Sequence, residues 1–179
     1  MPATDQAHEV ARLIDDDREL AQVVAADDAQ LEEPQRRYPG QVIGIRQEDN
    51  WRLSGEGIVA CNAEDPVHLA RLFDRYEFRS VLDCAGNCAL RACELDPQLA
   101  WRINVEGVRN LLNCLAARPV RLVHLSIDLV FSGNGPGGHV EDDPTDPVTV
   151  YGRTMVASER LIEERMPEVA AELQQVAPF

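Results

Sequence analysis

Short apolar runs alternate with longer amphipathic stretches along most of this 179-residue chain. Runs rich in β-branched and other apolar residues predict strands at residues 41–46, 57–61, 80–84 and 120–126. Apolar residues at helical spacing predict helices at residues 65–76, 97–117 and 151–165. Strands that alternate with helices in this way are typical of an α/β fold built on a parallel sheet.

The N-terminal stretch has a different pattern. Residues 4–24 fit an amphipathic helix that Thr4 can cap, with apolar residues at helical spacing and three successive aspartates on its outer face. We therefore expect residues 1–40 to form an acidic helical segment that precedes a domain at residues 41–179. The acidic face is either solvated or an arm that binds a partner.

The charge of the chain excludes several kinds of partner. A net charge of −14 disfavours nucleic acid and anionic membranes, which both require a basic face. No run approaches the roughly 18 to 20 apolar residues of a membrane span, and the N-terminus has no signal pattern, so we expect a cytoplasmic protein.

The five cysteines lack metal-site spacing and are expected to be reduced, buried thiols. All 17 basic residues are arginine, so no step in this chain can use a lysine ammonium.

Several motifs follow one another between residues 80 and 160. The helix at 97–117 has the pattern NxxGxxN, and the strand at 120–126 ends on the serine of a Ser-Ile-Asp segment. A longer signature then consists of Glu141, Asp142, Asp143, Pro144, Pro147, Tyr151 and Gly152, with Glu159 on the next helix. Residues 40–165, and most specifically 80–160, resemble the extended short-chain dehydrogenases, and in particular the dTDP-4-dehydrorhamnose reductase family.

The resemblance implies a Rossmann-like, doubly wound parallel sheet. Members of this family continue for roughly another hundred residues with a substrate-binding domain, so we expect an incomplete domain here. The family's first strand lies at the sheet centre and leads into a glycine-rich phosphate loop. The nearest candidate, residues 23–31, has alanines where glycines are needed, because a Cβ blocks a positive φ and close phosphate approach. We therefore expect this strand and loop to be degenerate or absent.

The family's chemistry depends on a tyrosine that exchanges a proton with the sugar oxygen while hydride moves to or from the nicotinamide. A lysine four residues later lowers the pKa of the tyrosine and binds the nicotinamide ribose, and a Ser or Thr hydroxyl fixes the substrate oxygen. Tyr151 occupies the tyrosine position, but Met155 stands at the lysine position and Ile127 at the hydroxyl position. The catalytic candidates are therefore Tyr151, Asp128 and Ser126, and Ser126 could replace the missing hydroxyl only if the strand end shifted its register.

The resemblance also implies a cofactor, NADP or NAD, and a nucleotide-sugar ligand. The candidate cofactor contacts are Ala85, Gly86, Asn104, Tyr151 and Arg46. Asn104 is expected to hold the active-site backbone and a water, or else to be an ordinary polar helix residue, and Gly107 to let its helix pack closely on the sheet. Arg46 ends the second strand, where it either favours the 2′-phosphate of NADP or is simply exposed to solvent.

Four functions remain open from the sequence. The chain is a weakened or inactive relative that keeps a role in binding a nucleotide sugar or dinucleotide or a role as a scaffold, or it is an active reductase or epimerase that uses Tyr151. Alternatively it is a truncated product, or an interaction subunit that regulates another enzyme. A homo-oligomer is expected, because an incomplete domain leaves apolar surface and strand edges to be covered.

Overall fold

A five-stranded parallel sheet forms the centre of the computed structural model, which describes residues 21–24, 35–46, 54–84, 89–135, 137–140 and 143–167. Its strands are β1 (Ala21–Val24), β2 (Gly44–Arg46), β3 (Ile58–Ala60), β4 (Ser80–Asp83) and β5 (Arg121–His124). The strands lie in the order β3-β2-β1-β4-β5, and every neighbouring pair is parallel. This order confirms the doubly wound Rossmann-like sheet, in which the direction of winding reverses between β1 and β4.

The central strand β1 corrects two expectations, the helix that the sequence predicts for residues 4–24 and a first strand that is degenerate or absent. Residues 21–24 pair in register with residues 80–83, and Val23 also pairs with Gly44 of β2. A central parallel strand is covered on both faces and reads as a continuous apolar run, which periodicity alone does not distinguish from a helical segment. The rest of the predicted helix and the candidate phosphate loop at residues 25–31 lie outside the described residues. The domain boundary at residue 40 stays a prediction, although β1, which precedes it, belongs to the sheet.

Two helices begin at capping signals that the sequence contains. The helix α3 (Pro66–Arg75) is capped by Asp65 and α5 (Pro97–Trp101) by Asp96, each with a proline at the first turn. The predicted helix at 97–117 continues from α5 through a π-helical turn, η1 (Arg102–Glu106), into α6 (Gly107–Leu115). The last helix, α7 (Val150–Arg165), is also confirmed. Among the described elements, α4 (Leu90–Leu95) and the 3-10 turn η2 (Asp128–Val130) were not predicted.

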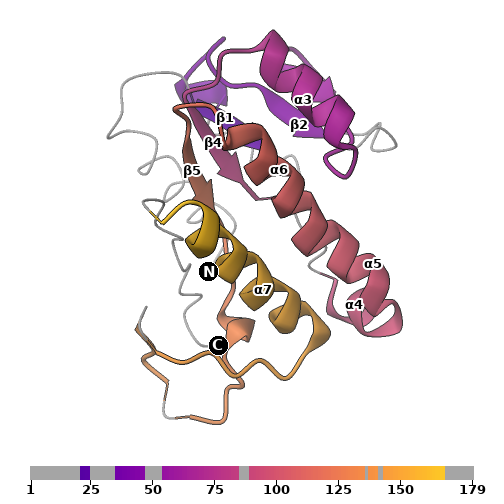
Figure 1. Ribbon diagram of the computed structural model, residues 1–179, viewed down its shortest axis with the longest axis vertical. Coiled ribbons are helices and arrows are strands. Elements are labelled where there is room, and N and C mark those ends of the chain that lie inside the picture. Colours follow the sequence, from indigo (N-terminus) through magenta and orange to yellow (C-terminus); the bar gives the residue numbers. More distant parts are fainter. Residues whose placement is uncertain are drawn as a thin grey trace.

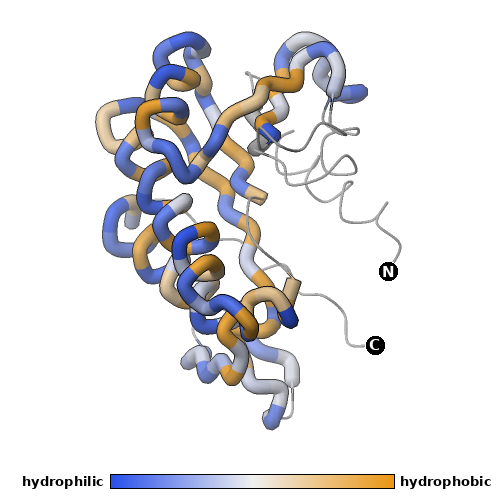
Figure 2. Tube along the Cα trace, turned by 90° about the vertical axis from the view of Figure 1, so that its right-hand side faces the viewer, coloured by the Kyte–Doolittle hydropathy of each residue, from blue (hydrophilic) through white to orange (hydrophobic). Residues whose placement is uncertain are grey.

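The main core lies on one face of the sheet. Ile45, Val81 and Leu122 point from the strands into a cluster with the apolar residues of α3 and α6 and with Ile162 of α7. Figure 1 shows α3, α6 and α7 over this face, and in Figure 2 the strands are largely hydrophobic while the helices alternate in hydropathy. Leu82 and Val123 point to the opposite face, as expected from the alternation of a strand. Within the described ranges, no helix has both the length and the apolar character that a bilayer crossing requires.

Candidate functional site

The candidate site lies at the carboxyl ends of the strands, where the chain leaves the sheet. Arg46 ends β2, Asp83 ends β4, and Ser126 follows β5 within two residues. In doubly wound sheets ligands bind at these ends, next to the point where the strand order reverses. Two of the predicted cofactor contacts, Ala85 and Gly86, follow β4 but lie outside the described residues.

Tyr151 lies in the first turn of α7, and its neighbours fix this turn on both sides. The hydroxyl oxygen of Thr149 accepts a hydrogen bond of 2.9 Å from the backbone N–H of Gly152, and this bond caps the helix. The carboxylate of Glu94 on α4 accepts the backbone N–H of Val150 at 2.7 Å. A negative charge at a helix N-terminus is stabilising, and here it also fastens α4 to the turn that carries the tyrosine. Glu94 was not identified from the sequence.

The surroundings of Tyr151 are apolar. Its side chain is only 7% exposed and packs in a buried cluster with Met155 and Val156 of its own helix, together with Cys93, Ala100 and Val130. Met155 is 4% exposed and occupies the position one turn after the tyrosine. Ile127, at the position of the expected hydroxyl, packs against the same cluster. A thioether and a branched alkyl group can neither pair with a phenolate nor hydrogen-bond a substrate oxygen.

Gly152 brings the first turn of α7 against η2. A Cβ on this glycine would collide with the carbonyl oxygen of Leu129 and lie 3.0 Å from the Cβ of Pro147. The glycine of the Tyr-Gly pair is therefore required by packing, since any side chain would push the tyrosine turn away from residues 128–130. Asp128, the first residue of η2, is exposed and is accessible to a ligand.

Asn104 lies in the π-helical turn and joins it to α7. Its side-chain amide donates to Oγ1 of Thr154 at 2.9 Å, and Thr154 in turn donates to the carbonyl of Tyr151 at 2.7 Å. The hydroxyl of Ser158 donates to the carbonyl of Asn104 at 2.6 Å. A π-turn changes the helical hydrogen-bond pattern, and such turns are frequent at functional sites. Asn104 is thus linked through Thr154 to the backbone of the tyrosine turn, and its role at a ligand site stays a prediction.

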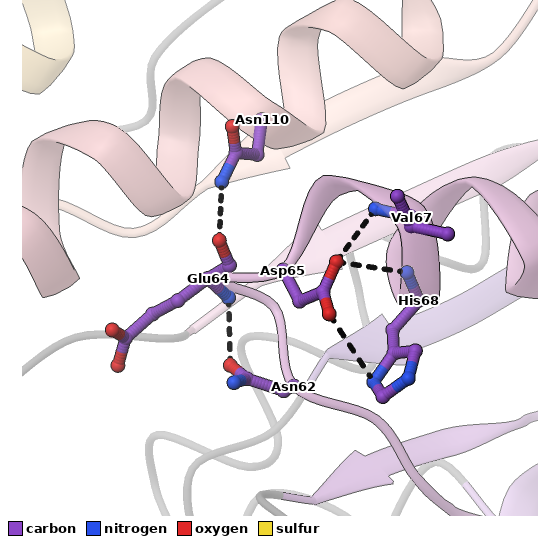
Figure 3. A network of polar contacts seen from close by, with 6 residues as sticks. All are labelled: Asn62, Glu64, Asp65, Val67, His68 and Asn110. Carbon is purple, nitrogen blue, oxygen red and sulfur yellow. Dashed lines mark hydrogen bonds and ion pairs between the residues drawn. The ribbon is translucent and has the colours of Figure 1, made fainter.

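The other two residues of the NxxGxxN pattern have different roles. Asn110 donates to the carbonyl of Glu64 at 2.9 Å and so binds the loop after β3, which Asn62 and Asp65 also stabilise (Figure 3). The hydrogen bond from the backbone of Val67 holds the pKa of Asp65 below its usual value. The expectation that Gly107 permits close packing is wrong, because a Cβ there would meet nothing within 4 Å in the described structure outside its own helix.

Ser126 contacts the middle of α7, at Glu159, rather than its first turn, which carries Tyr151. Its hydroxyl donates to the carboxyl group of Glu159, and both side chains are buried at 8% exposure. Burial raises the pKa of Glu159, while the hydrogen bond from Ser126 and the nearby His124 act in the opposite direction. A catalytic role of Ser126 stays a prediction, and the hydroxyl is already engaged in holding α7 on the sheet.

A second buried polar pair lies beside the first and was not identified from the sequence. Nδ1 of His124 lies 3.0 Å from Oδ2 of Asp83, with the two residues 1% and 3% exposed. Nε2 of the same imidazole is buried and has no hydrogen-bond partner among the described residues. The signal in the sequence was a polar residue at the last position of two apolar strand runs.

The loop between η2 and α7 is ordered by contacts of its own. Asp146 accepts hydrogen bonds from the backbone and the hydroxyl of Ser132, each at 2.6 Å, and these bonds lower the pKa of its carboxyl group. The imidazole of His139 stacks on Phe131 with the ring centroids 3.8 Å apart, and its Nδ1 lies 3.2 Å from Asp143. Asp143 of the signature and the nearby Asp146 thus both stabilise the described part of this loop.

A family model described as the RmlD substrate binding domain matches residues 9–171. The chain belongs to this family. It is 42% identical over 88 residues to a dTDP-4-dehydrorhamnose reductase of Streptomyces griseus, a match that covers 49% of the chain and 29% of that protein. It is 35% identical over 135 residues to the enzyme of the same name from Mycolicibacterium smegmatis, covering 72% of the chain and 41% of that protein.

The solved structures show the same fold for this RmlD-family chain. A dTDP-4-dehydrorhamnose reductase of Bacillus anthracis, in complex with NADP, superposes with a TM-score of 0.66 at 21% identity, covering 83% of this chain and 50% of that one. At this identity the similarity establishes the Rossmann-like fold alone. The chain matches less than half of the length of the two curated relatives named above and half of the solved structure.

Proposed function

We propose that this chain is a member of the RmlD family that binds a pyridine dinucleotide or a nucleotide sugar but has weak or no hydride-transfer activity. The observation that carries the proposal is the pair Tyr151 and Met155. The phenol is present, but the residue one turn later is a thioether, 4% exposed, in an apolar cluster. The chain contains no lysine, so no ammonium group from another position of it can take the place of the missing one.

The hydroxyl that should fix the substrate oxygen is also missing. Ile127 stands at that position and packs into the apolar cluster, while Ser126 donates to the buried Glu159. Of the predicted catalytic set, Tyr151 supplies the phenol and Asp128 is exposed. General acid–base assistance is worth roughly 10²–10⁴ in rate, so losing the groups that orient and ionise the phenol removes a large part of the activity.

Binding is better supported than catalysis. The strand order places the reversal point between β1 and β4, where a dinucleotide lies in folds of this kind, and Asn104 keeps the tyrosine turn in position. The Bacillus anthracis relative binds NADP. Arg46 at the end of β2 would bind the 2′-phosphate of NADP, and the bound dinucleotide would supply the hydride in any residual reduction.

The test combines calorimetry with an activity assay. NADPH, NADH and dTDP are titrated into the protein, and NADPH oxidation is followed with dTDP-4-dehydrorhamnose as substrate. We expect binding of at least one ligand together with negligible oxidation. An absence of all binding would remove the binding role.

A second candidate is an active reductase or epimerase that uses Tyr151, and the names of the curated relatives favour it. In that case NADPH oxidation is measurable and disappears in Tyr151→Phe. An oxidation rate that Tyr151→Phe does not change would contradict this candidate. The same assay therefore separates the two functions.

We also propose that the protein associates with itself. Leu95 and Val148 are 76% and 61% exposed, and Trp101 is 44% exposed. Large apolar side chains at the surface favour protein contacts. Sedimentation velocity tests this, and a monomer at all concentrations would contradict it.

A further inference from the structure

Glu94 joins the short helix α4 to the turn that carries Tyr151. Of the six residues of α4, only Cys93 is buried, and it belongs to the same apolar cluster as Tyr151. The carboxylate of the next residue, Glu94, accepts the backbone N–H of Val150 at 2.7 Å. Two successive residues of α4 therefore meet the first turn of α7, one through the side-chain cluster and one through the backbone.

The bond from Glu94 completes the start of α7. The first N–H groups of a helix have no partner within it, and Val150 is the first residue of α7. The hydroxyl of Thr149 accepts from Gly152, which leaves the N–H of Val150 to another acceptor. Glu94 supplies that acceptor from 56 residues away, and its charge is favourable at a helix N-terminus. This cap is therefore a tertiary contact, which couples the position of α4 to that of α7.

Two further contacts hold the same turn, both after its first residue. Gly152 packs against η2, and the hydroxyl of Thr154 donates to the carbonyl of Tyr151. Neither contact involves Val150, the residue directly before the tyrosine. The bond from Glu94 thus fixes the point where the chain enters the helix, which sets the direction in which the side chain of Tyr151 leaves the backbone.

We propose that Glu94 is a positioning residue of the ligand site: its hydrogen bond to the backbone of Val150 keeps the first turn of α7 formed and so fixes where the phenol of Tyr151 meets a ligand. Glu94 acts through the backbone of Val150 and needs no contact with the ligand. Its effect on ligand affinity rests on the proposed dinucleotide-binding function, whereas its effect on the tyrosine turn does not.

The test compares two substitutions of Glu94 with one at another helix start. Glu94→Gln keeps a side-chain oxygen that can accept the N–H of Val150, whereas Glu94→Ala has no acceptor. Asp65→Ala is the matched control, because Asp65 caps α3 by accepting the N–H of Val67 at 2.8 Å (Figure 3). Glu94 is exposed, so both of its variants are expected to fold. Both alanine variants should lower the midpoint of urea unfolding, since each loses a helix cap.

Fluorine NMR separates positioning of the tyrosine from general stability. The protein is labelled with 3-fluorotyrosine, and the resonance of Tyr151 is identified by its disappearance in Tyr151→Phe. We expect Glu94→Ala to shift or broaden this resonance, and Glu94→Gln and Asp65→Ala to leave it near its original place. An unchanged Tyr151 resonance in Glu94→Ala, an equal change in Asp65→Ala, or equal behaviour of the two Glu94 variants would overturn the proposal.

Calorimetry with two ligands measures the effect on binding. Tyr151 is the expected neighbour of the nicotinamide, and adenosine 2′,5′-bisphosphate is the part of NADP that lacks the nicotinamide. We expect Glu94→Ala to weaken NADPH binding by about fivefold, the typical effect of one lost helix cap, and Glu94→Gln to restore most of it. The affinity for the bisphosphate should stay unchanged. Equal losses of affinity for both ligands would indicate a general effect on the fold and would contradict the positioning role.

The two measurements fail in different ways. If the unaltered protein binds no NADPH, the proposed function fails, and the Tyr151 resonance still decides whether Glu94 fixes the tyrosine turn. If that resonance changes in Glu94→Ala but the affinity for NADPH does not, the binding function stands and the role of Glu94 at the ligand site is wrong.

Discussion

The side-chain amide of Asn104 donates to the hydroxyl of Thr154 at 2.9 Å, although 50 residues separate them in the sequence. Both residues are 2% exposed, and the hydroxyl of Thr154 in turn donates a hydrogen bond to the carbonyl of Tyr151. The position of the tyrosine turn therefore depends on a π-helical turn in a different helix. This dependence makes the contact testable by stability alone, without a substrate.

Asn104→Ala leaves the buried hydroxyl of Thr154 without its donor. We expect the free energy of unfolding to fall by about 1–3 kcal/mol, measured by urea denaturation. Asn113→Ala, at an exposed residue of α6 that accepts from Arg165, is the control and should change it by less than about 0.5 kcal/mol. In a double-mutant cycle with Thr154→Val, additive effects would show that the two side chains do not interact.

Two glycines on neighbouring helices should respond to alanine in opposite directions. Gly152→Ala places a Cβ against the carbonyl of Leu129, so we expect a loss of about 3 kcal/mol. Gly107→Ala meets open space in an ordinary helical conformation and should gain about 0.5–1 kcal/mol. Thermal unfolding of the two variants measures both effects. A stabilised Gly152→Ala would mean that α7 does not lie against η2 as described.

Met155→Lys restores an ammonium one turn after Tyr151. Because Met155 is 4% exposed, we expect lower stability together with an increase in NADPH oxidation over the unaltered protein. The gain should disappear in the double variant Tyr151→Phe/Met155→Lys and be absent from Met155→Leu. The rate of NADPH oxidation in the presence of dTDP-4-dehydrorhamnose measures this gain. No gain in a folded Met155→Lys would show that the missing cation is not the main loss.

Glu159 should make stability depend on pH. Burial raises its pKa above the ordinary value of 4.5, so the folded protein binds this proton more tightly than the unfolded chain does. The resulting stabilisation is complete below about pH 4.5 and is lost as the pH rises through the folded pKa. Urea unfolding across this range should show a steeper loss in the unaltered protein than in Glu159→Gln, which keeps an acceptor for Ser126. Glu164→Gln, exposed on the same helix, is the control and should follow the unaltered protein.

Arg46→Gln tests cofactor choice. If the guanidinium binds the 2′-phosphate, the affinity for NADPH should fall by about tenfold or more while that for NADH stays unchanged. Calorimetry with both dinucleotides measures the ratio. Equal losses of affinity for NADPH and NADH would indicate that Arg46 stabilises the end of β2 and does not contact the 2′-phosphate.

Local signals in the sequence predicted much of the fold. The strands β2 to β5 and the helices α3 and α7 follow from apolar periodicity and from capping residues such as Asp65. The strand β1 was misassigned because a run of four residues, three of them apolar, fits the periodicity of a helix as well as that of a strand. The helix α4 was missed because only Cys93 of its six residues is buried.

Less of the candidate site could be predicted from the sequence. Pairs such as Ser126 with Glu159 and Asp83 with His124 join residues far apart in the chain, and only the assembled sheet brings them together.

The central place of β1 has a consequence for synthesis. Ala21–Val24 leaves the ribosome long before Ser80–Asp83, the strand that covers one of its two edges. Until that later segment emerges, the nascent chain presents an apolar strand with an open row of backbone donors and acceptors. A ribosome that stalls before residue 80 therefore holds this protein in a form prone to self-association, and chaperone capture is useful in that interval.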